Sequence, residues 1–387
     1  MTVESFQIRV PDEVLDDLKY RLKHVRWPEP LGPTGWEHGT DLSYLQSLVT
    51  YWQEQYDWRE QEAKLNSFSQ FRSNVDGIDV HFVHERGKGP SPLPIILTHG
   101  WPDSYLRYQK IIPMLTDPAR YGGDPEDSFD VIVPSLPGFG FSSSPDYRGI
   151  NNFRVSEVWA KLMTEELGYR KFAAAGGDIG SGVTRYLASN HPELLFGIHL
   201  TDIGIIKGLM NPNDQAELSE EELQYKRSAQ EWISREGGYM TLQSTKPQTL
   251  AYGLSDSPVG LAGWIIEKFR AWSDCKGDLR NSFSEDELLT NIMIYWITNT
   301  IGSTAHMYYE NTHSLPALGR IEVPTGIAIL PADVLTPPKD WAMRNLNITR
   351  WTSLPRGGHF TAMEEPELLA EDIRAFYRHF RTGMEQK

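Results

Sequence analysis

Four short apolar segments, each bounded by glycine or proline, most constrain how this chain can fold. They are residues 94–98, 130–134, 172–175 and 196–200. Helical patterns, such as those of 153–167 and 181–189, lie between them. Strands that are apolar on both faces are typical of a parallel sheet covered by helices on both sides. The sequence therefore predicts an α/β protein with a mostly parallel central sheet.

Other patterns precede these strands. Apolar residues recur at helical spacing over 14–25 and again over 45–52. Residues 71–73 and 78–82 then alternate in polarity around Asp76-Gly77, a dipeptide typical of a tight hairpin turn. The pattern predicts helices near the N-terminus, followed by an antiparallel hairpin that begins the sheet.

After Asp202 the strand pattern stops, and it resumes only near Pro324. The stretch between them is helical and rich in tryptophan and tyrosine, so a mainly helical insertion is expected to interrupt the sheet. The last helix carries an apolar stripe that would cover a sheet face. We expect four regions: an N-terminal extension (1–68), the first part of the core (69–201), a helical lid (202–315) and the second part of the core (316–387).

Composition excludes several classes of protein. The formal net charge is −15, with no long basic run, so nucleic acid is not an expected partner. The first twenty residues are too charged for a signal peptide, and no apolar run could span a bilayer. We therefore expect a soluble, cytoplasmic protein without a membrane anchor. The single cysteine, Cys275, excludes an internal disulfide and a multi-cysteine metal centre, and no His-Glu-x-x-His pattern indicates a metal.

The segment Gly176-Gly177-Asp178-Ile179-Gly180 follows an apolar strand and precedes a helical pattern. This arrangement is typical of a nucleophile elbow, but the residue at its apex is a carboxylate rather than serine. Near a helix N-terminus the charged form of Asp178 is favoured. A carboxylate attacks esters poorly, yet it can displace a leaving group from saturated carbon and form an alkyl ester. The alternative, that Asp178 only caps the helix, stays open at this point.

A candidate base and acid follow in the order that this architecture uses. His359 comes after Gly357-Gly358, at the end of the last expected strand, and we interpret it as the general base. A solvated loop histidine is the alternative. Asp333 ends the preceding apolar run and is the favoured acid, with Asp202 as its competitor.

The loop after the first central strand is Thr98-His99-Gly100-Trp101-Pro102. In this architecture such a loop provides one oxyanion-binding N–H, and the residue after the nucleophile provides the other. The backbone N–H groups of Trp101 and Ile179 are therefore the expected donors. We interpret His99 as a structural residue of the loop.

Several blocks in order resemble the epoxide hydrolases of the α/β-hydrolase fold, specifically the group similar to microsomal epoxide hydrolase that has an N-terminal extension. The blocks are Phe6 to Trp27-Pro28, residues 99–104, residues 134–142, the Asp178 elbow, 238–240, 256–260, 307–311 and 357–360. The resemblance implies two lid tyrosines that hold the epoxide oxygen, and block matching assigns them to Tyr239 and Tyr308. Tyr309 is adjacent, which leaves the second assignment open.

The resemblance implies that an epoxide and water give a vicinal diol without a cofactor, in detoxification or secondary metabolism. A hydrophobic or aromatic epoxide is the expected substrate, and a homodimer is left open. Two alternatives remain: a haloalkane dehalogenase with the same carboxylate nucleophile, and a non-catalytic ligand-binding protein on this fold. Dehalogenases tend to place tryptophan after the nucleophile, where this chain has Ile179.

Overall fold

The computed structural model describes residues 3–29, 32, 35–145, 148–204 and 218–381. Within these residues the strands form one nine-stranded sheet in the order β1-β2-β3-β5-β4-β6-β7-β8-β9. Neighbours from β5 to β9 are parallel, and those from β1 to β5 are antiparallel. The predicted mostly parallel sheet is confirmed. The strands are β1 (Glu4–Phe6), β2 (Gln70–Val75), β3 (Ile78–Glu85), β4 (Leu93–Thr98), β5 (Phe129–Pro134), β6 (Phe172–Gly176), β7 (Leu195–Leu200), β8 (Ile321–Ile329) and β9 (Leu346–Ser353).

The apolar segments become the buried centre of this sheet. Every residue of β4, β5 and β6 is buried. Because the central strands are parallel, the loops that follow β4, β6 and β8 open at the same edge of the sheet. These loops carry Trp101, Asp178 and Asp333, which explains how residues far apart in the sequence can meet.

The predicted hairpin joins β2 to β3. Val75 pairs with Ile78, so the turn consists of Asp76 and Gly77. Both residues have positive φ, 51° and 81°, as a tight two-residue turn requires.

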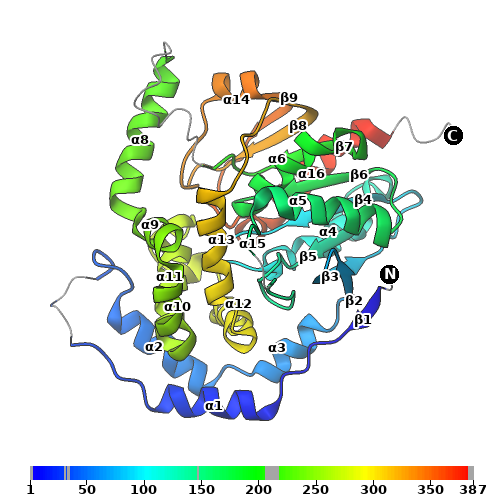
Figure 1. Ribbon diagram of the computed structural model, residues 1–387. Helices are drawn as coiled ribbons and strands as arrows, with labels where there is room; N and C mark the ends of the chain where they lie inside the picture. The colour runs from blue at the N-terminus through cyan, green and yellow to red at the C-terminus, as the bar shows by residue number, and fades with distance from the viewer. Residues whose placement is uncertain (1–2, 30–31, 33–34, 146–147, 205–217, 382–387) are drawn as a thin grey trace.

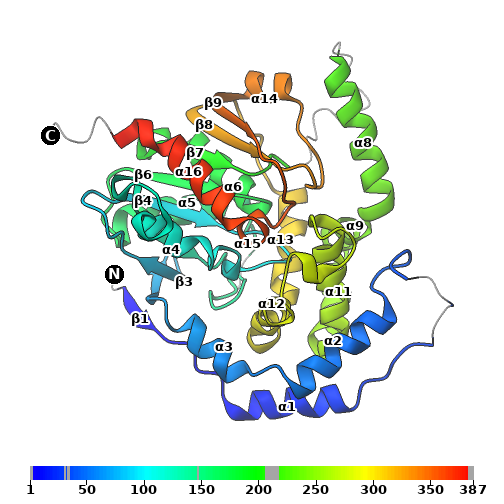
Figure 2. The same cartoon turned by 180° about the vertical axis from the view of Figure 1, so that it is seen from behind.

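Helices cover both faces of the sheet. In the two opposite views, α5 and α6 lie on one face and α4 and α16 on the other (Figure 1, Figure 2). The sheet is thereby shielded from water, as its apolar strands require. The helices of this core are α4 (Ile111–Thr116), α5 (Asn152–Lys161), α6 (Ile179–Asn190), α14 (Lys339–Asn345), α15 (Thr361–Glu364) and α16 (Pro366–Arg381).

A helical insertion separates β7 from β8, as the sequence predicts. Its described helices are α8 (Glu220–Glu236), α9 (Gly238–Thr245), α10 (Pro247–Asp256), α11 (Pro258–Trp272), α12 (Glu285–Thr298) and α13 (Ile301–His313). The N-terminal helices α1 (Asp12–Lys23) and α2 (Leu42–Glu54) contact α11, so the extension packs against the insertion (Figure 1). Residues 205–217, which belong to the expected lid, lie outside the described residues.

Two of the elements that have no counterpart among the expected ones depend on distant contacts. β1 has only three residues and is held by its pairing with β2, so it is too short for a sequence pattern. Helix α3 (Trp58–Leu65) buries Gln61 and Glu62 together with its apolar ends, so it lacks an apolar stripe. The Glu62 carboxylate accepts a hydrogen bond of 2.7 Å from the backbone N–H of Val10, a distant contact that local periodicity cannot reveal.

Candidate active site

Asp178 stands at a strained turn between β6 and α6. Its backbone has φ 57° and ψ −126°, a conformation that residues other than glycine rarely adopt. The turn is tight because glycine permits close approach: a Cβ added at Gly180 would lie 1.9 Å from the carbonyl oxygen of Thr98. The sequence around Asp178 therefore forces its side chain out of the turn.

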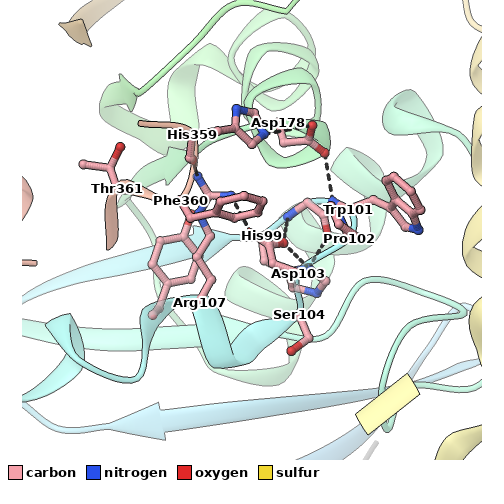
Figure 3. Close-up of polar contacts among 12 residues, drawn as sticks. His99, Trp101, Pro102, Asp103, Ser104, Arg107, Asp178, His359, Phe360 and Thr361 are labelled. Atoms are coloured by element: carbon pink, nitrogen blue, oxygen red, sulfur yellow. Dashed lines mark hydrogen bonds and ion pairs between the residues drawn. The ribbon is translucent and has the colours of Figure 1, made fainter. Parts of the chain in front are cut away.

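The carboxylate of Asp178 contacts groups from two other loops (Figure 3). Oδ1 accepts a hydrogen bond of 2.9 Å from the backbone N–H of Trp101, and Oδ2 lies 3.3 Å from Nε2 of His359. Asp178 occupies the N-cap position of α6, but its side chain makes no capping hydrogen bond. The helix-cap alternative therefore does not describe its side chain.

His359 and Asp333 form a short, buried pair. Nδ1 of His359 lies 2.8 Å from Oδ1 of Asp333, and each side chain is 7% exposed. Burial disfavours the imidazolium, but the carboxylates of Asp333 and Asp178 outweigh it and raise the pKa of His359 well above its ordinary value. The solvated-loop alternative for His359 does not fit this buried position.

Asp202 lies beside this pair but has a different contact. Its Oδ2 accepts a hydrogen bond of 2.6 Å from the backbone N–H of Asp178, and Oδ1 accepts one of 2.9 Å from Gly204. Burial and the nearby charge of Asp333 raise the pKa of Asp202 to about 6. Asp333 is hydrogen bonded to His359, whereas Asp202 holds the backbone of the turn. Sequence reasoning did not anticipate this second arrangement.

A cavity of about 580 Å³ opens onto the Asp178 carboxylate. Tyr239 and Tyr308 line it together with Asp178, His359 and Asp333. Much of the remaining wall is apolar: Ile203, Trp232, Met240, Trp272, Leu315 and Leu335.

Tyr239 from α9 and Tyr308 from α13 meet at Trp101. The Tyr239 ring stacks on the indole with centroids 5.2 Å apart and planes 8° apart, and the Tyr308 ring meets the indole edge-on at 5.7 Å. Tyr309 instead stacks on His313 at 4.1 Å and is not among the residues that line this cavity. Of the two adjacent tyrosines, only Tyr308 lines the cavity onto which Asp178 opens.

His99 is buried in the loop that carries Trp101. Its Nε2 accepts a hydrogen bond of 3.1 Å from the N–H of Leu136, and its Nδ1 lies 2.9 Å from the carbonyl oxygen of Gly100. Both ring nitrogens are therefore used in holding loops. This agrees with a structural role.

A buried ion pair beneath the site was missed at the sequence level. Arg107 and Asp103 form it, and Arg107 also donates a hydrogen bond to the carbonyl oxygen of His359 (Figure 3). The pair thus joins the loop that bears Trp101 to the loop that bears His359. Their four-residue spacing could have indicated an ion pair within one helical turn. Such spacing does not show which distant loop the pair holds in place.

Asp202, Asp333 and His359 offer ligand atoms within 4.8 Å of one another, the one group of this kind that the described residues contain. The hydrogen bonds argue against metal binding there. Nδ1 of His359 is paired with Asp333, and its Nε2 faces Asp178. Asp333 thus holds Nδ1, and Nε2 is directed at Asp178, so neither nitrogen is left for ligation.

Comparisons with known proteins identify the family. The model for the epoxide hydrolase N terminus matches residues 3–108, and that for the alpha/beta hydrolase fold matches residues 94–236. A relative from Stigmatella aurantiaca, provisionally named an epoxide hydrolase, is 45% identical and covers 98% of this chain and 86% of its own. Epoxide hydrolase 1 of rabbit (Oryctolagus cuniculus) is 36% identical and covers 97% of this chain and 88% of its own.

One expectation is wrong. The relatives contradict a cytoplasmic location, because the mammalian ones are microsomal enzymes associated with the membrane of the endoplasmic reticulum. A charged N-terminal segment argues only against a cleaved signal peptide, and it does not decide whether a protein associates with a membrane. Among the helices that the structure describes, none combines the length and the apolar composition needed to cross a bilayer.

Solved structures agree with the relatives. The structure of the Aspergillus niger epoxide hydrolase superimposes with a TM-score of 0.85 at 30% identity, and covers 98% of this chain and 97% of its own. The likeness extends over the N-terminal extension, the sheet and the helical insertion. Together with the matching family model and the relatives, it shows that the chain belongs to the epoxide hydrolase family of α/β-hydrolase-fold enzymes.

Proposed function

We propose that this epoxide hydrolase works in two steps through a covalent ester on Asp178. The observation that carries the proposal is the setting of the Asp178 carboxylate, which faces the cavity between Nε2 of His359 at 3.3 Å and the N–H of Trp101 at 2.9 Å. A charged carboxylate beside an apolar cavity suits attack on saturated carbon. This setting favours an epoxide over an ester or amide as substrate.

In the first step, an oxygen of Asp178 attacks one epoxide carbon, and the carbon–oxygen bond of the ring breaks. The electron pair stays on the departing oxygen, which takes a proton from a lid phenol, Tyr239 or Tyr308. Burial, together with the charge of Asp178, raises the pKa of both tyrosines well above the ordinary value. The neighbouring phenol adds to this increase at Tyr308, whereas the hydrogen bond with Tyr308 lowers the pKa of Tyr239. Both phenols are therefore protonated at neutral pH and available as donors.

In the second step, water attacks the ester carbonyl while His359 takes its proton and Asp333 orients the imidazole. Ester formation removes the negative charge of Asp178, which is one of the charges that raise the pKa of His359. The imidazole can then release its proton to solvent and act as a base. As the tetrahedral intermediate collapses, His359 passes the proton it took from water to the diol oxygen that leaves the ester. The N–H groups of Trp101 and Ile179 stabilise the tetrahedral oxyanion, at about 3 kcal/mol per donor.

We further propose a hydrophobic or aromatic epoxide as the substrate. Support comes from the cavity wall, where Trp232, Trp272, Met240 and Leu335 present apolar surface. Ile179 in place of tryptophan and the paired tyrosines, which suit an oxyanion better than a halide, argue against a dehalogenase. The catalytic residues and the family assignment argue against a purely binding role.

The proposed division of the chain keeps the boundaries expected from sequence. Residues 1–68 are the extension, 69–201 and 316–387 form the core, and 202–315 are the lid. Support comes from the contacts of α1 and α2 with α11 and from the helical insertion between β7 and β8.

Intact-mass analysis after mixing with an aromatic epoxide tests the covalent scheme. His359→Gln should still form the ester but hydrolyse it slowly, so an adduct of the substrate's mass should accumulate on the peptide that contains Asp178. Asp178→Ala should form none. In heavy-oxygen water, a single turnover of the unmodified enzyme should place label in Asp178, because the attacking water oxygen enters the carboxyl group. An unlabelled Asp178 and no adduct would rule out the covalent path.

A further inference from the structure

A buried lysine lies against one of the lid tyrosines. The Lys268 side chain on α11 is only 5% exposed. Its Nζ lies 4.9 Å from the centre of the Tyr239 ring and 5.6 Å from that of Trp264. Within the part of the chain that the structure describes, Glu267 is the one carboxylate paired with it. Burial of a charge costs free energy unless neighbouring groups compensate it. The position of Lys268 therefore indicates a role beyond packing.

The same tyrosine ring is held by several other aromatic groups. Trp101 stacks on it at 5.2 Å, and the rings of Trp272 and Tyr308 lie 5.2 and 5.8 Å from it. Tyr239 is therefore the ring at which the loop of Trp101, the lid and the lysine ammonium meet. A cation close to an aromatic ring is stabilised by the ring's electrons, and it stabilises negative charge that develops on that ring.

We propose that Lys268 promotes opening of the epoxide by acting through Tyr239. It holds the phenol in place and stabilises the negative charge that the phenol acquires when its proton passes to the epoxide oxygen. The inference rests on the proposed covalent function. Lys268 is a positioning residue rather than a catalytic one, because the cavity is lined by Tyr239 and not by the lysine.

The proton balance of the cycle is as follows. Ring opening forms the bond between Asp178 and carbon, breaks one carbon–oxygen bond and leaves a hydroxyl on the substrate and a phenolate at Tyr239. Hydrolysis of the ester then releases the diol and leaves Asp178 as a carboxylic acid. Ionisation of this acid returns a proton to Tyr239. Lys268 is expected to stabilise the phenolate during the interval between these two transfers.

Glu267 provides an internal test because its charge has the opposite effect. After burial and the charge of Asp178, the Glu267 carboxylate also raises the pKa of Tyr239. The ammonium of Lys268 should make proton donation easier, and the carboxylate of Glu267 should make it harder. If the pair mattered only for packing of α11, loss of either member should have a similar effect.

The experiment is a single-turnover measurement with enzyme in excess, in which ester formation and ester hydrolysis are timed separately. Lys268→Met should slow ester formation by roughly ten- to thirty-fold and leave hydrolysis within about twofold. The slowing should be larger for alkyl epoxides than for epoxides with electron-withdrawing substituents, because a more basic oxygen needs proton donation more. Lys268→Arg should restore most of the rate, since it retains the cation.

Two further variants are the controls. Lys246→Met removes an exposed lysine of the same lid and should change neither step. Glu267→Gln removes the pair but keeps the cation, so ester formation should not slow. If Lys268→Met and Glu267→Gln slow it equally, or if hydrolysis slows in parallel, the inference is wrong. Lys268→Gln replaces the methionine variant if that one does not fold.

Failure of this inference can be told apart from failure of the covalent scheme. If His359→Gln yields no adduct on Asp178, the scheme itself fails, whatever Lys268 does. If the adduct forms and Lys268→Met makes it at the unmodified rate, only the inference about Lys268 fails.

Discussion

The two walls of the cavity at Asp178 are held in place by different forces. On the core side, Asp178 and His359 stand on loops at strand ends and are positioned by directional contacts of 2.6–3.3 Å. On the lid side, Tyr239 and Tyr308 stand on helices and are positioned by ring contacts of 5.2–5.8 Å. Hydrogen bonds depend steeply on geometry, whereas aromatic packing tolerates small shifts. We therefore expect substitutions of core residues such as Asp178 to abolish a step of the reaction, and substitutions of the lid tyrosines to slow one.

Asp178→Asn should have the largest effect. The amide has nearly the shape of the carboxylate but cannot attack carbon, so turnover should fall by about 10⁴-fold or more. The rate of steady-state diol formation measures this loss of turnover, and thermal unfolding checks that the fold is retained. A residual rate within tenfold of the unmodified enzyme would remove Asp178 from the role of nucleophile.

Asp333→Asn should have the next largest effect, with Asp202→Asn as its matched control. An amide at 333 does not stabilise the imidazolium, so hydrolysis of the ester should slow by about 10³-fold. Asp202→Asn loosens the backbone of the turn and should slow both steps only several-fold. Single-turnover kinetics separate the two cases. If Asp202→Asn slowed ester hydrolysis more than Asp333→Asn did, Asp202 would be the acid that orients His359.

Tyr308→Phe and Tyr309→Phe compare two adjacent hydroxyls on one helix. Loss of a proton donor should slow ester formation by about 10²-fold in the first variant. The second should stay within twofold, because Tyr309 stacks on His313 outside the cavity. The rate of adduct formation on a His359→Gln background gives the measurement. A Tyr308→Phe rate within twofold of the unmodified enzyme would rule out the Tyr308 hydroxyl as a required proton donor.

Two glycine substitutions sharpen the comparison through stability alone. Gly180→Ala would place a Cβ 1.9 Å from a backbone oxygen, so it should destabilise the core by about 2–3 kcal/mol. Gly253→Ala lies in the lid helix α10 with no heavy atom within 4 Å of the added Cβ, so it should stabilise the protein by about 0.5–1 kcal/mol. Denaturant unfolding measures the free energy of unfolding of each variant and so checks the sign of both changes.

Much of the fold could be predicted from local patterns. The buried runs became β4 to β7, and Asp76-Gly77 became the hairpin turn, because both follow from periodicity and turn chemistry. Two of the elements that were missed, β1 and α3, depend on distant partners: β1 on its pairing with β2, and α3 on the contact of Glu62 with Val10.

The candidate site divides in the same way. Asp178 and His359 could be predicted without the fold, since a glycine-flanked aspartate and a late histidine at strand ends are local features that a parallel sheet brings to one edge. Tertiary contacts, by contrast, placed Tyr308 rather than Tyr309 in the wall of the cavity, gave Asp202 its backbone contact and set Lys268 against Tyr239. The contacts of the tyrosine and the lysine depend on how the helices of the insertion rotate and pack on the core, whereas that of Asp202 depends on the pairing of β6 with β7. Side-chain packing between elements distant in sequence, rather than any local pattern, sets that rotation.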